Sequence, residues 1–336
     1  MLAFLLSLAS VPHVFAQDKG TSIPLDHFYV KRTGGGLRAL LSKLHFGLST
    51  GYGSTTFKHD LDGFIILQQP DSVPKIISSG PPPGSVGYTN WFNQVELASD
   101  VTTGTSFQVN SDTAEIGFKS KGFNIPLRAT VHVEFLNRYR VGGGFSYEFQ
   151  KMNDFEPISY GNDISNFSPS FSSFSLTKYF LILGGSVYRY KKFLLTVDAN
   201  IGGYGLGKKF EKSQITKGVF MNLGGTVEYE MSEYFRLFVR PSYDIKSYKL
   251  NIPETGQSIQ HKFNAFYFNV GVSYRFPELK RCFHKQCKAQ INHAHGNKEY
   301  RSRVHPFYKK QNPHHGENYP ELIKYKGRNK RKLNPY

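Results

Sequence analysis

The chain has 336 residues, of which 39% are hydrophobic and 15% aromatic, and a formal net charge of +17. Its mean hydropathy is −0.41. Beyond the first few residues no apolar run approaches the roughly 18 residues of a transmembrane helix, which excludes a helical membrane protein. The many aromatics and the 32 glycines instead favour a membrane β-barrel, where apolar lipid-facing residues alternate with polar lumen residues. A soluble β-sandwich or lipocalin-type barrel is the competing interpretation.

The N-terminus carries the apolar segment Leu2–Ser10, followed by Val-Phe-Ala at positions 14–16. An apolar stretch with a small residue at a cleavage position is typical of a secretory signal peptide. We therefore predict an export signal over residues 1–16 and a short N-terminal segment over residues 17–42.

Residues 43–276 contain eight segments in which apolar side chains take one parity and polar side chains or glycine take the other. This alternation predicts β-strands, because successive side chains of a strand point to opposite faces. The fourth segment is the weakest, since Ile182 and Tyr188 fall on the polar parity. In chain order, the predicted strands cover residues 44–52, 127–135, 139–149, 179–188, 193–202, 219–230, 235–246 and 266–276.

Short and long connections alternate between these segments. Tight turns are expected at 136–138, 190–192 and 230–234, and long polar links at 58–120, 151–174, 206–217 and 250–262. Tight periplasmic turns and long extracellular loops are the outer-membrane pattern. The sequence thus predicts an all-β fold: an antiparallel up-and-down transmembrane β-barrel of about eight strands. Aromatic residues beside the turns predict a periplasmic girdle: Phe135, Tyr139, Tyr190, Phe193, Tyr229, Tyr234, Phe235 and Phe276.

Two features depart from a plain barrel. Pro241 interrupts the seventh strand, which predicts a β-bulge there. The link 58–120 contains an apolar stretch, Phe64–Leu67, and Trp91, the only tryptophan. This link is expected either to extend the barrel wall as a hairpin or to add two strands, making ten. Links this long are usually functional or disordered.

The lumen of an eight-stranded barrel is wide enough only for its own side chains. Buried charges must be paired, so the inward parity predicts a salt-bridge network that fills the lumen. No nucleophile elbow, metal-ligand spacing or loop-borne Ser/His pair indicates catalysis, so we expect no enzyme and no cofactor. The predicted network comprises Arg128, His132, Glu134, Arg140, Glu148, Asp198, Glu228, Glu230, Arg236, Arg240, Asp244 and Arg275.

The composition changes at Pro277. Residues 280–336 hold 15 Lys and Arg against 3 Asp and Glu, and half of the 12 histidines. Such a segment cannot bury enough surface to fold alone, so we predict a basic, largely irregular periplasmic tail over 277–336. An acidic periplasmic protein is the favoured partner; peptidoglycan or lipid and a merely solvated tail are alternatives, and nucleic acid is not expected. The predicted contacts are Lys280, Arg281, Arg301, Arg303, Phe307, Tyr308, Lys324, Tyr325, Arg328 and Arg331.

The two cysteines, Cys282 and Cys287, both lie in this tail. A close pair in an exported protein favours a local disulfide. Together with His284, His293 and His295 they could instead hold Zn²⁺. The C-x-H-x2-C spacing is not that of a standard zinc finger, so we expect a disulfide or a reduced pair of thiols and no metal.

The eight-strand pattern that closes on Tyr274-Arg275-Phe276 resembles small outer-membrane barrels of the OmpA-like and PorT/PorG-like class of Bacteroidota. The resemblance covers 43–276 and rests on alternation, loop rhythm and the terminal aromatic residue. In secretion-associated members the barrel anchors a periplasmic assembly, which implies a non-enzymatic anchor or accessory subunit with its tail in the periplasm. This tail is unlike the peptidoglycan-binding domain of some relatives. A surface receptor or adhesin using the 58–120 link is the alternative.

Overall fold

The computed structural model describes residues 31–78, 87–98, 107–136, 138–312 and 315. The predicted signal peptide at 1–16 and the first part of the predicted segment 17–42 lie outside these residues. None of the helices within the described ranges has the length and apolar character needed to span a membrane.

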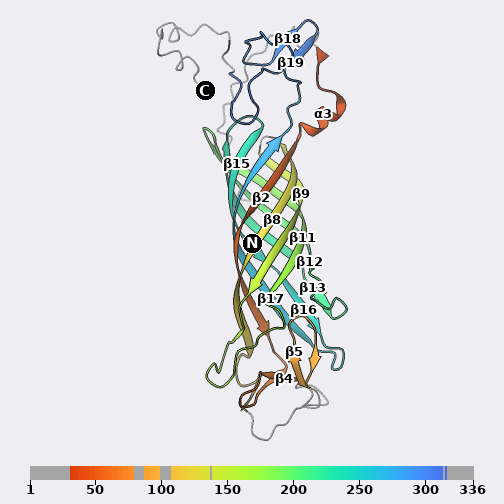
Figure 1. The fold of residues 1–336 in the computed structure, drawn as a ribbon, viewed down its shortest axis with the longest axis vertical. Helices are drawn as coiled ribbons and strands as arrows, with labels where there is room; N and C mark the ends of the chain where they lie inside the picture. The colour runs from red at the N-terminus through yellow and green to blue at the C-terminus, as the bar shows by residue number, and fades with distance from the viewer. Residues whose placement is uncertain (1–30, 79–86, 99–106, 137, 313–314, 316–336) are drawn as a thin grey trace.

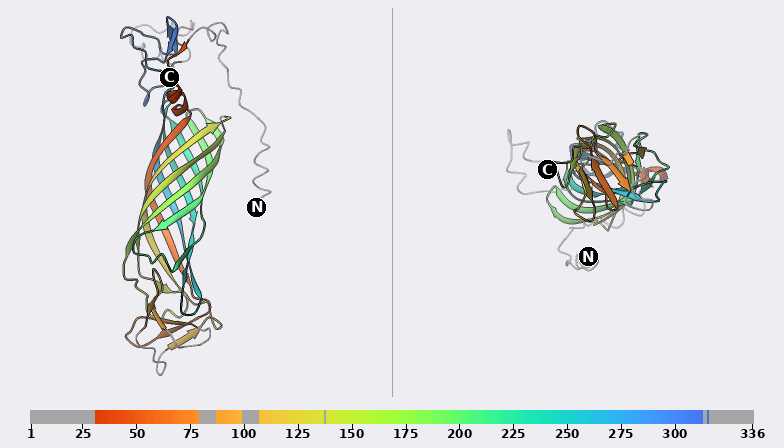
Figure 2. Two further views of the ribbon diagram at one scale, coloured as in Figure 1. Left: turned by 90° about the vertical axis from the view of Figure 1, so that its right-hand side faces the viewer. Right: turned by 90° about the horizontal axis from the view of Figure 1, so that it is seen from below.

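Eight long strands among the described residues form the body of the molecule (Figure 1). Neighbouring strands are antiparallel, and β2 pairs with both β17 and β8, so the sheet closes into a ring (Figure 2). The predicted closed antiparallel barrel is confirmed. In ring order the strands are β2 (Leu44–Asp60), β8 (Gly117–Phe135), β9 (Tyr139–Met152), β11 (Ser173–Tyr190), β12 (Phe193–Leu206), β14 (Phe220–Glu230), β15 (Phe235–Ile245) and β17 (Ser258–Arg275).

Most strands run further than the sequence predicted, and the long links are shorter. Strand β2 continues to Asp60 and β8 begins at Gly117, so their connection covers 61–116 rather than 58–120. The period of two persists in these extensions, but its polarity is reversed: Phe57 is buried and Lys119 is exposed. Because the extensions carry polar residues on their outer face, the sequence pattern of a lipid-facing strand does not include them.

Two local predictions about the strands are wrong. The register between β11 and β12 shifts between Ser186 and Tyr188. This bulge turns Tyr188 outward, where 58% of its surface is exposed, although its parity predicted an inward position. Pro241 is not a bulge, because it stays in regular register opposite Phe268. The ladder to β14 is instead interrupted beside it, as expected for a residue without an N–H to donate.

The link 61–116 forms a cap at the lower end of the barrel in Figure 1, which we call the loop end. Its strands make a separate five-stranded sheet in the order β6-β5-β4-β3-β7. Neither predicted arrangement, a hairpin extending the wall or two further wall strands, occurs among the described residues. The cap strands are β3 (Phe64–Gln68), β4 (Lys75–Ser78), β5 (Gly87–Asn90), β6 (Glu96–Leu97) and β7 (Phe107–Asn110).

Three short strands extend the wall at the loop end. Strand β10 (Glu156–Pro157) pairs with β8, and β13 (Ile215–Lys217) pairs with β16 (Ser247–Asn251), which in turn pairs with β17. The barrel wall therefore extends further at the loop end than the eight predicted strands alone would reach.

Aromatic side chains fill the barrel where it meets the cap. Phe57 of β2 stacks on Phe263 of β17, with ring centroids 6.4 Å apart, and contacts Phe92 of the cap link at the same distance. Trp91 is fully buried and stacks on Phe167 at 4.2 Å. We call the residues that close this end the aromatic plug: Phe57, Phe92, Phe155, Phe174 and Phe263.

At the opposite end, the tail end, the N-terminal and C-terminal parts of the described chain meet (Figure 1). Strand β1 (Lys31–Arg32) pairs in parallel with β19 (Lys298–Tyr300), which pairs antiparallel with β18 (His293–His295). Helix α3 (Gly36–Leu41) leads from β1 into the barrel. We call residues 31–41 and 277–312 the tail unit.

The tail unit is largely irregular, as predicted, but it folds against the barrel rather than extending away from it. The Phe307 ring lies 5.3 Å from the rings of both Phe235 and Tyr274 at the barrel rim. The Gln311 N–H donates to Oε1 of Glu233 at 2.9 Å. The sequence predicted that this segment cannot bury enough surface to fold alone, and for these residues the barrel rim supplies the apolar and acidic surface.

Candidate functional site

An apolar belt surrounds the outside of the barrel. Each of the eight ring strands contributes aliphatic or aromatic side chains that are exposed on its outer face. Soluble monomers rarely expose apolar patches above a few hundred Å², whereas a lipid-facing wall requires such a belt. Its members include Leu48, Leu127, Val131, Val141, Phe145, Leu181, Leu183, Val197, Leu223, Val227, Leu237 and Val270.

Aromatic residues mark both margins of the belt. In β9, Tyr139 lies beside the tight turn and Phe149 lies ten residues further on, and both are exposed. This separation matches the 9–11 residues that a tilted strand needs to cross a hydrocarbon core. The exposed residues of the predicted girdle at the tail end are Phe135, Tyr139, Tyr190, Phe193 and Phe276.

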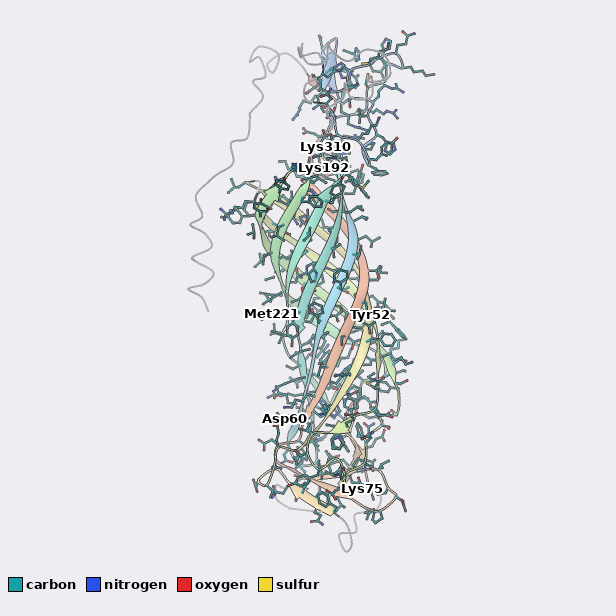
Figure 3. All side chains as sticks on the ribbon, turned by 90° about the vertical axis from the view of Figure 1, so that its left-hand side faces the viewer. Tyr52, Asp60, Lys75, Lys192, Met221 and Lys310 are labelled. Carbon is teal, nitrogen blue, oxygen red and sulfur yellow. The ribbon has the colours of Figure 1, made fainter. Side chains whose placement is uncertain are left out.

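Beyond the second margin the wall has the polarity of a soluble protein. Lys119, Lys121 and Lys262 are exposed there, and the inward-facing Phe263 is buried. Figure 3 places Tyr52 partway along the wall and Asp60, the last residue of the same strand, close to the cap. On this side, the apolar belt therefore ends where the outer face of the wall becomes polar and water-exposed.

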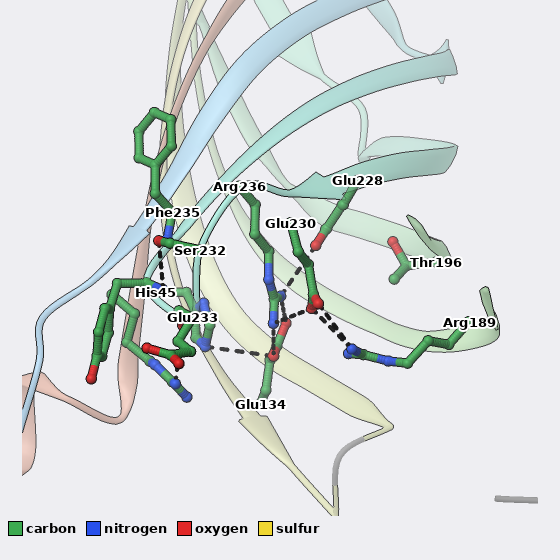
Figure 4. A network of polar contacts seen from close by, with 12 residues as sticks. His45, Glu134, Arg189, Thr196, Glu228, Glu230, Ser232, Glu233, Phe235 and Arg236 are labelled. Atoms are coloured by element: carbon green, nitrogen blue, oxygen red, sulfur yellow. Dashed lines mark hydrogen bonds and ion pairs between the residues drawn. The ribbon is translucent and has the colours of Figure 1, made fainter. Parts of the chain in front are cut away.

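Inside the barrel, acidic and basic side chains pair directly at the tail end (Figure 4). Arg236 donates to Glu134 at 2.7 Å and to Glu228 at 3.1 Å. Arg140 forms a bidentate pair with Glu228 and lies 2.7 Å from Glu134. Nη2 of Arg236 also lies 3.5 Å from Oε1 of Glu230. We call these five residues the tail-end cluster.

The tail-end cluster connects to two histidines and to the tail unit. His45 and His132 stack with ring centroids 5.1 Å apart and lie 3.5 and 3.7 Å from the carboxylate of Glu134. Glu230 also pairs with Lys310 at 3.4 Å. The basic tail is thus bonded to the lumen network through a shared carboxylate.

A second layer lies further inside. Arg240 donates from Nε to Asp198 at 3.1 Å, and the hydroxyl of Thr226 donates to the same carboxylate at 3.2 Å. The Arg128 guanidinium lies over the ring of Phe180 at 4.5 Å. Each cation therefore has a carboxylate or an aromatic face as its partner.

A third layer lies next to the aromatic plug. Lys178 pairs with both Glu148 and Asp244, and Lys246 lies 3.2 Å from Asp244. The hydroxyl of Tyr267 donates to Glu148 at 2.8 Å. Two cations and two carboxylates thus balance in a buried site, the condition under which buried charges are tolerated.

The structure therefore brings together nearly all of the residues predicted for the lumen. Arg275 is the exception, because it turns to the rim and donates to the main-chain oxygen of Glu233 at 3.2 Å. Lys178 was not among the residues predicted for the lumen. It shares its parity with the apolar Phe180 and Ile182, so this face of the strand does not read as polar. The sequence did contain a sign of its position, because Lys178 is the one cation on that parity of its strand.

These layers leave the lumen occupied from end to end. Three tiers of paired charges fill it, and the aromatic plug closes it at the loop end. The interior of an eight-stranded barrel is too narrow for an aqueous channel in any case. The arrangement suits a rigid, closed wall.

The tail unit presents basic residues on its surface. Lys280 and Arg281 are exposed, whereas Arg301 is buried, donates to the Val304 oxygen at 2.9 Å and lies over the Tyr234 ring at 5.8 Å. Arg301, predicted to contact a partner, is thus engaged inside the protein, whereas Phe307 packs on the barrel rim and remains 46% exposed. Four other predicted contacts lie outside the described residues: Lys324, Tyr325, Arg328 and Arg331.

A cleft of about 370 Å³ opens on the tail unit. Four of its ten lining residues are Lys or Arg and none is acidic, and Arg303 also donates to the main-chain oxygen of His284 at 3.3 Å. We call it the basic cleft; its polar lining includes Arg281, Lys288, Arg303, Tyr308 and Lys309.

The expected disulfide is not present, because both cysteines are free thiols. The sulfur of Cys282 lies 3.3 Å from Nε2 of His295, and that of Cys287 lies 3.2 Å from Nε2 of His293. Each sulfur thus faces an imidazole nitrogen, and the two sulfurs lie within 4.8 Å of each other. Burial raises the pKa of the Cys282 thiol.

No family model and no curated protein matches the chain in sequence. Solved structures with similar folds include the outer-membrane protease OmpT from Escherichia coli (14% identity, TM-score 0.30, covering 69% of this chain and 96% of that one). The outer-membrane protein OprG from Pseudomonas aeruginosa is 11% identical with a TM-score of 0.33, covering 74% and 98%. At these TM-scores the likeness carries no argument of its own, and the barrel rests on the strand pairings.

Proposed function

We propose that the chain spans an outer membrane as a non-enzymatic barrel that anchors an assembly through its basic tail unit. The observation that carries the membrane placement is the apolar belt, which runs round all eight ring strands between two aromatic margins. Lipid is the solvent that such a belt requires. The closed ring satisfies its own backbone hydrogen bonds, as a lipid-exposed sheet must.

The role of anchor follows from how the two ends differ. The lumen is occupied by paired charges, so transport through it is not proposed. The tight turns of up-and-down outer-membrane barrels face the periplasm, and the tail unit lies beside these turns, which supports a periplasmic tail. Exposed cations gather there: Lys280, Arg281, Lys285, Lys288, Lys298 and Lys309.

The basic cleft supports an acidic partner. Four cationic side chains and Tyr308 line it, a set that suits carboxylates and an aromatic or apolar anchor. An acidic periplasmic protein is the proposed ligand, and peptidoglycan, which also carries carboxylates, is the competing source of the same chemistry.

Co-purification from detergent-solubilised membranes tests the proposal. Removing 280–336 should abolish co-purification of a periplasmic partner, and reversing Arg281, Lys288 and Lys309 to Glu should weaken it while the barrel remains folded. Reversing Lys119, Lys121 and Lys249, which are exposed at the loop end, is the matched control and should change nothing. Unchanged partners in the truncated protein would refute the anchor role.

A surface receptor or adhesin is the second candidate, and one observation favours it. The cap has its own sheet, and a cavity of about 510 Å³ lies between the link and the 161–165 segment, with Gln68, Asp71 and Phe107 in its lining. Deleting 70–73 should then abolish ligand or cell binding while leaving co-purification through the tail intact.

A further inference from the structure

Four metal-ligating side chains converge in the tail unit. One ligand atom from each of Cys282, Cys287, His293 and His295 lies within 4.8 Å of all the others. The Nε2 atoms of the two histidines are 3.1 Å apart, and each lies 3.2–3.3 Å from one sulfur. In a tetrahedral zinc site, bond lengths of about 2.0–2.3 Å place neighbouring ligand atoms roughly 3.3–3.8 Å apart. We propose that these four residues bind one Zn²⁺ ion.

Local structure brings each donor to this point. His293 and His295 are two residues apart in strand β18, so their side chains share one face. Gly296 follows with φ +58°, which lets the chain turn directly into β19. The Cys282 N–H donates to the Arg301 oxygen at 3.0 Å, and the Cys287 N–H closes a turn by donating to the His284 oxygen at 3.1 Å. The donors are thus held by backbone hydrogen bonds.

The outer contacts of the cluster are also those of a metal site. Nδ1 of His293 lies 2.9 Å from the Ile291 oxygen. A carbonyl oxygen only accepts, so Nδ1 carries the proton and Nε2 directs a lone pair at the cluster. Cys282 is only 2% exposed and the other three ligands are half-buried, so the site is partly withdrawn from water.

The donor set identifies the metal. Two thiolates and two imidazoles are the ligands of structural zinc sites. They do not suit Mg²⁺ or Ca²⁺, which prefer oxygen ligands. A disulfide would use the same two sulfurs but would leave the convergence of the two histidines without a role. Zinc would join the turn at Cys287 to the β18–β19 hairpin. Since Cys287 also lines the basic cleft, zinc would order one wall of it.

The test uses the full chain purified in detergent without chelators. Elemental analysis should find one zinc per chain, and Co²⁺ replacing it should give the charge-transfer and d–d absorption of a tetrahedral thiolate site. His293→Ala and His295→Ala should each lower zinc affinity by about 100-fold or more. His305→Ala, a tail histidine outside the cluster, is the matched control and should retain full zinc content.

The histidine variants separate zinc from a disulfide, because they remove only the metal ligands. The proposal is overturned if they retain zinc, or if denatured wild-type protein shows no free thiols and no zinc. The shift of the unheated protein on a denaturing gel reports barrel folding, so a loss of zinc without a loss of this shift is a local effect. Zinc should also slow tryptic cleavage in 277–312, and slowing that persists in His293→Ala would count against the site.

Discussion

Replacing Lys178 by Met tests the paired lumen most directly. Its ammonium pairs with both Glu148 and Asp244, and all three side chains are at most 3% exposed. The change removes the cation at similar volume and leaves two buried carboxylates with Lys246, which lies 3.2 Å from Asp244. Removing one partner of a buried pair costs about 3–5 kcal/mol. The folding equilibrium constant should therefore fall by roughly 150- to 4000-fold.

The free energy of unfolding would be measured in urea with the barrel in lipid vesicles, using fluorescence of the buried Trp91 and the gel shift as independent probes. Lys249→Met, at an exposed loop-end position, is the control and should stay within about 0.5 kcal/mol of wild type. Adding Glu148→Gln to Lys178→Met should recover part of the loss, because one uncompensated charge is removed. Equal unfolding free energies for Lys178→Met and Lys249→Met would show that the buried pairing of Lys178 does not stabilise the barrel.

Three further outcomes are expected. Leu183→Arg, in the apolar belt, should destabilise the barrel in vesicles by about 2–4 kcal/mol, and Thr56→Arg, on the polar extension of β2, by much less; equal losses would contradict the position of the belt. Phe307→Ala should weaken docking of the tail unit by about 1–2 kcal/mol, seen as faster hydrogen exchange in 300–312 with unchanged barrel stability, and no change in exchange would argue against docking at the rim. Burial raises the pKa of Glu233, so its protonated form is favoured when the tail is docked: docking should be strongest below the ordinary glutamate pKa and weaken as pH rises through the raised value. Glu233→Gln should flatten this dependence of exchange on pH, after correction for intrinsic rates, and an unchanged profile would exclude Glu233 as its source.

Local alternation accounts for most of the fold that could be predicted. All eight predicted segments coincide with ring strands, three of them overrunning the strand by one residue, and the three tight turns fall where the sequence placed them. Strand extensions such as residues 53–60 of β2 were not predicted, because the polarity of the two faces reverses where the wall leaves the apolar belt. An alternation with a period of two indicates that a strand is present, but not which of its two faces contacts water.

The lumen was predictable to the same degree. The inward parity identified the charges, and Arg140, Glu134 and Glu228 do pair. Partners could not be assigned, because pairing depends on the registers of strands that are distant in sequence and meet only when the ring closes. The partners of Lys178 could not be assigned either, since its carboxylates come from β9 and β15.

Local pattern and composition were enough to predict an antiparallel barrel with an apolar outer face, a charged interior and a basic tail. Three features of the protein follow only from its tertiary contacts. The first long link folds into a cap over an aromatic plug, the tail docks on the barrel rim, and Cys282 and Cys287 converge with His293 and His295. Each of these features depends on contacts between segments far apart in the chain, or on a backbone turn that orients a side chain. Neither kind of contact produces a periodic pattern in the sequence.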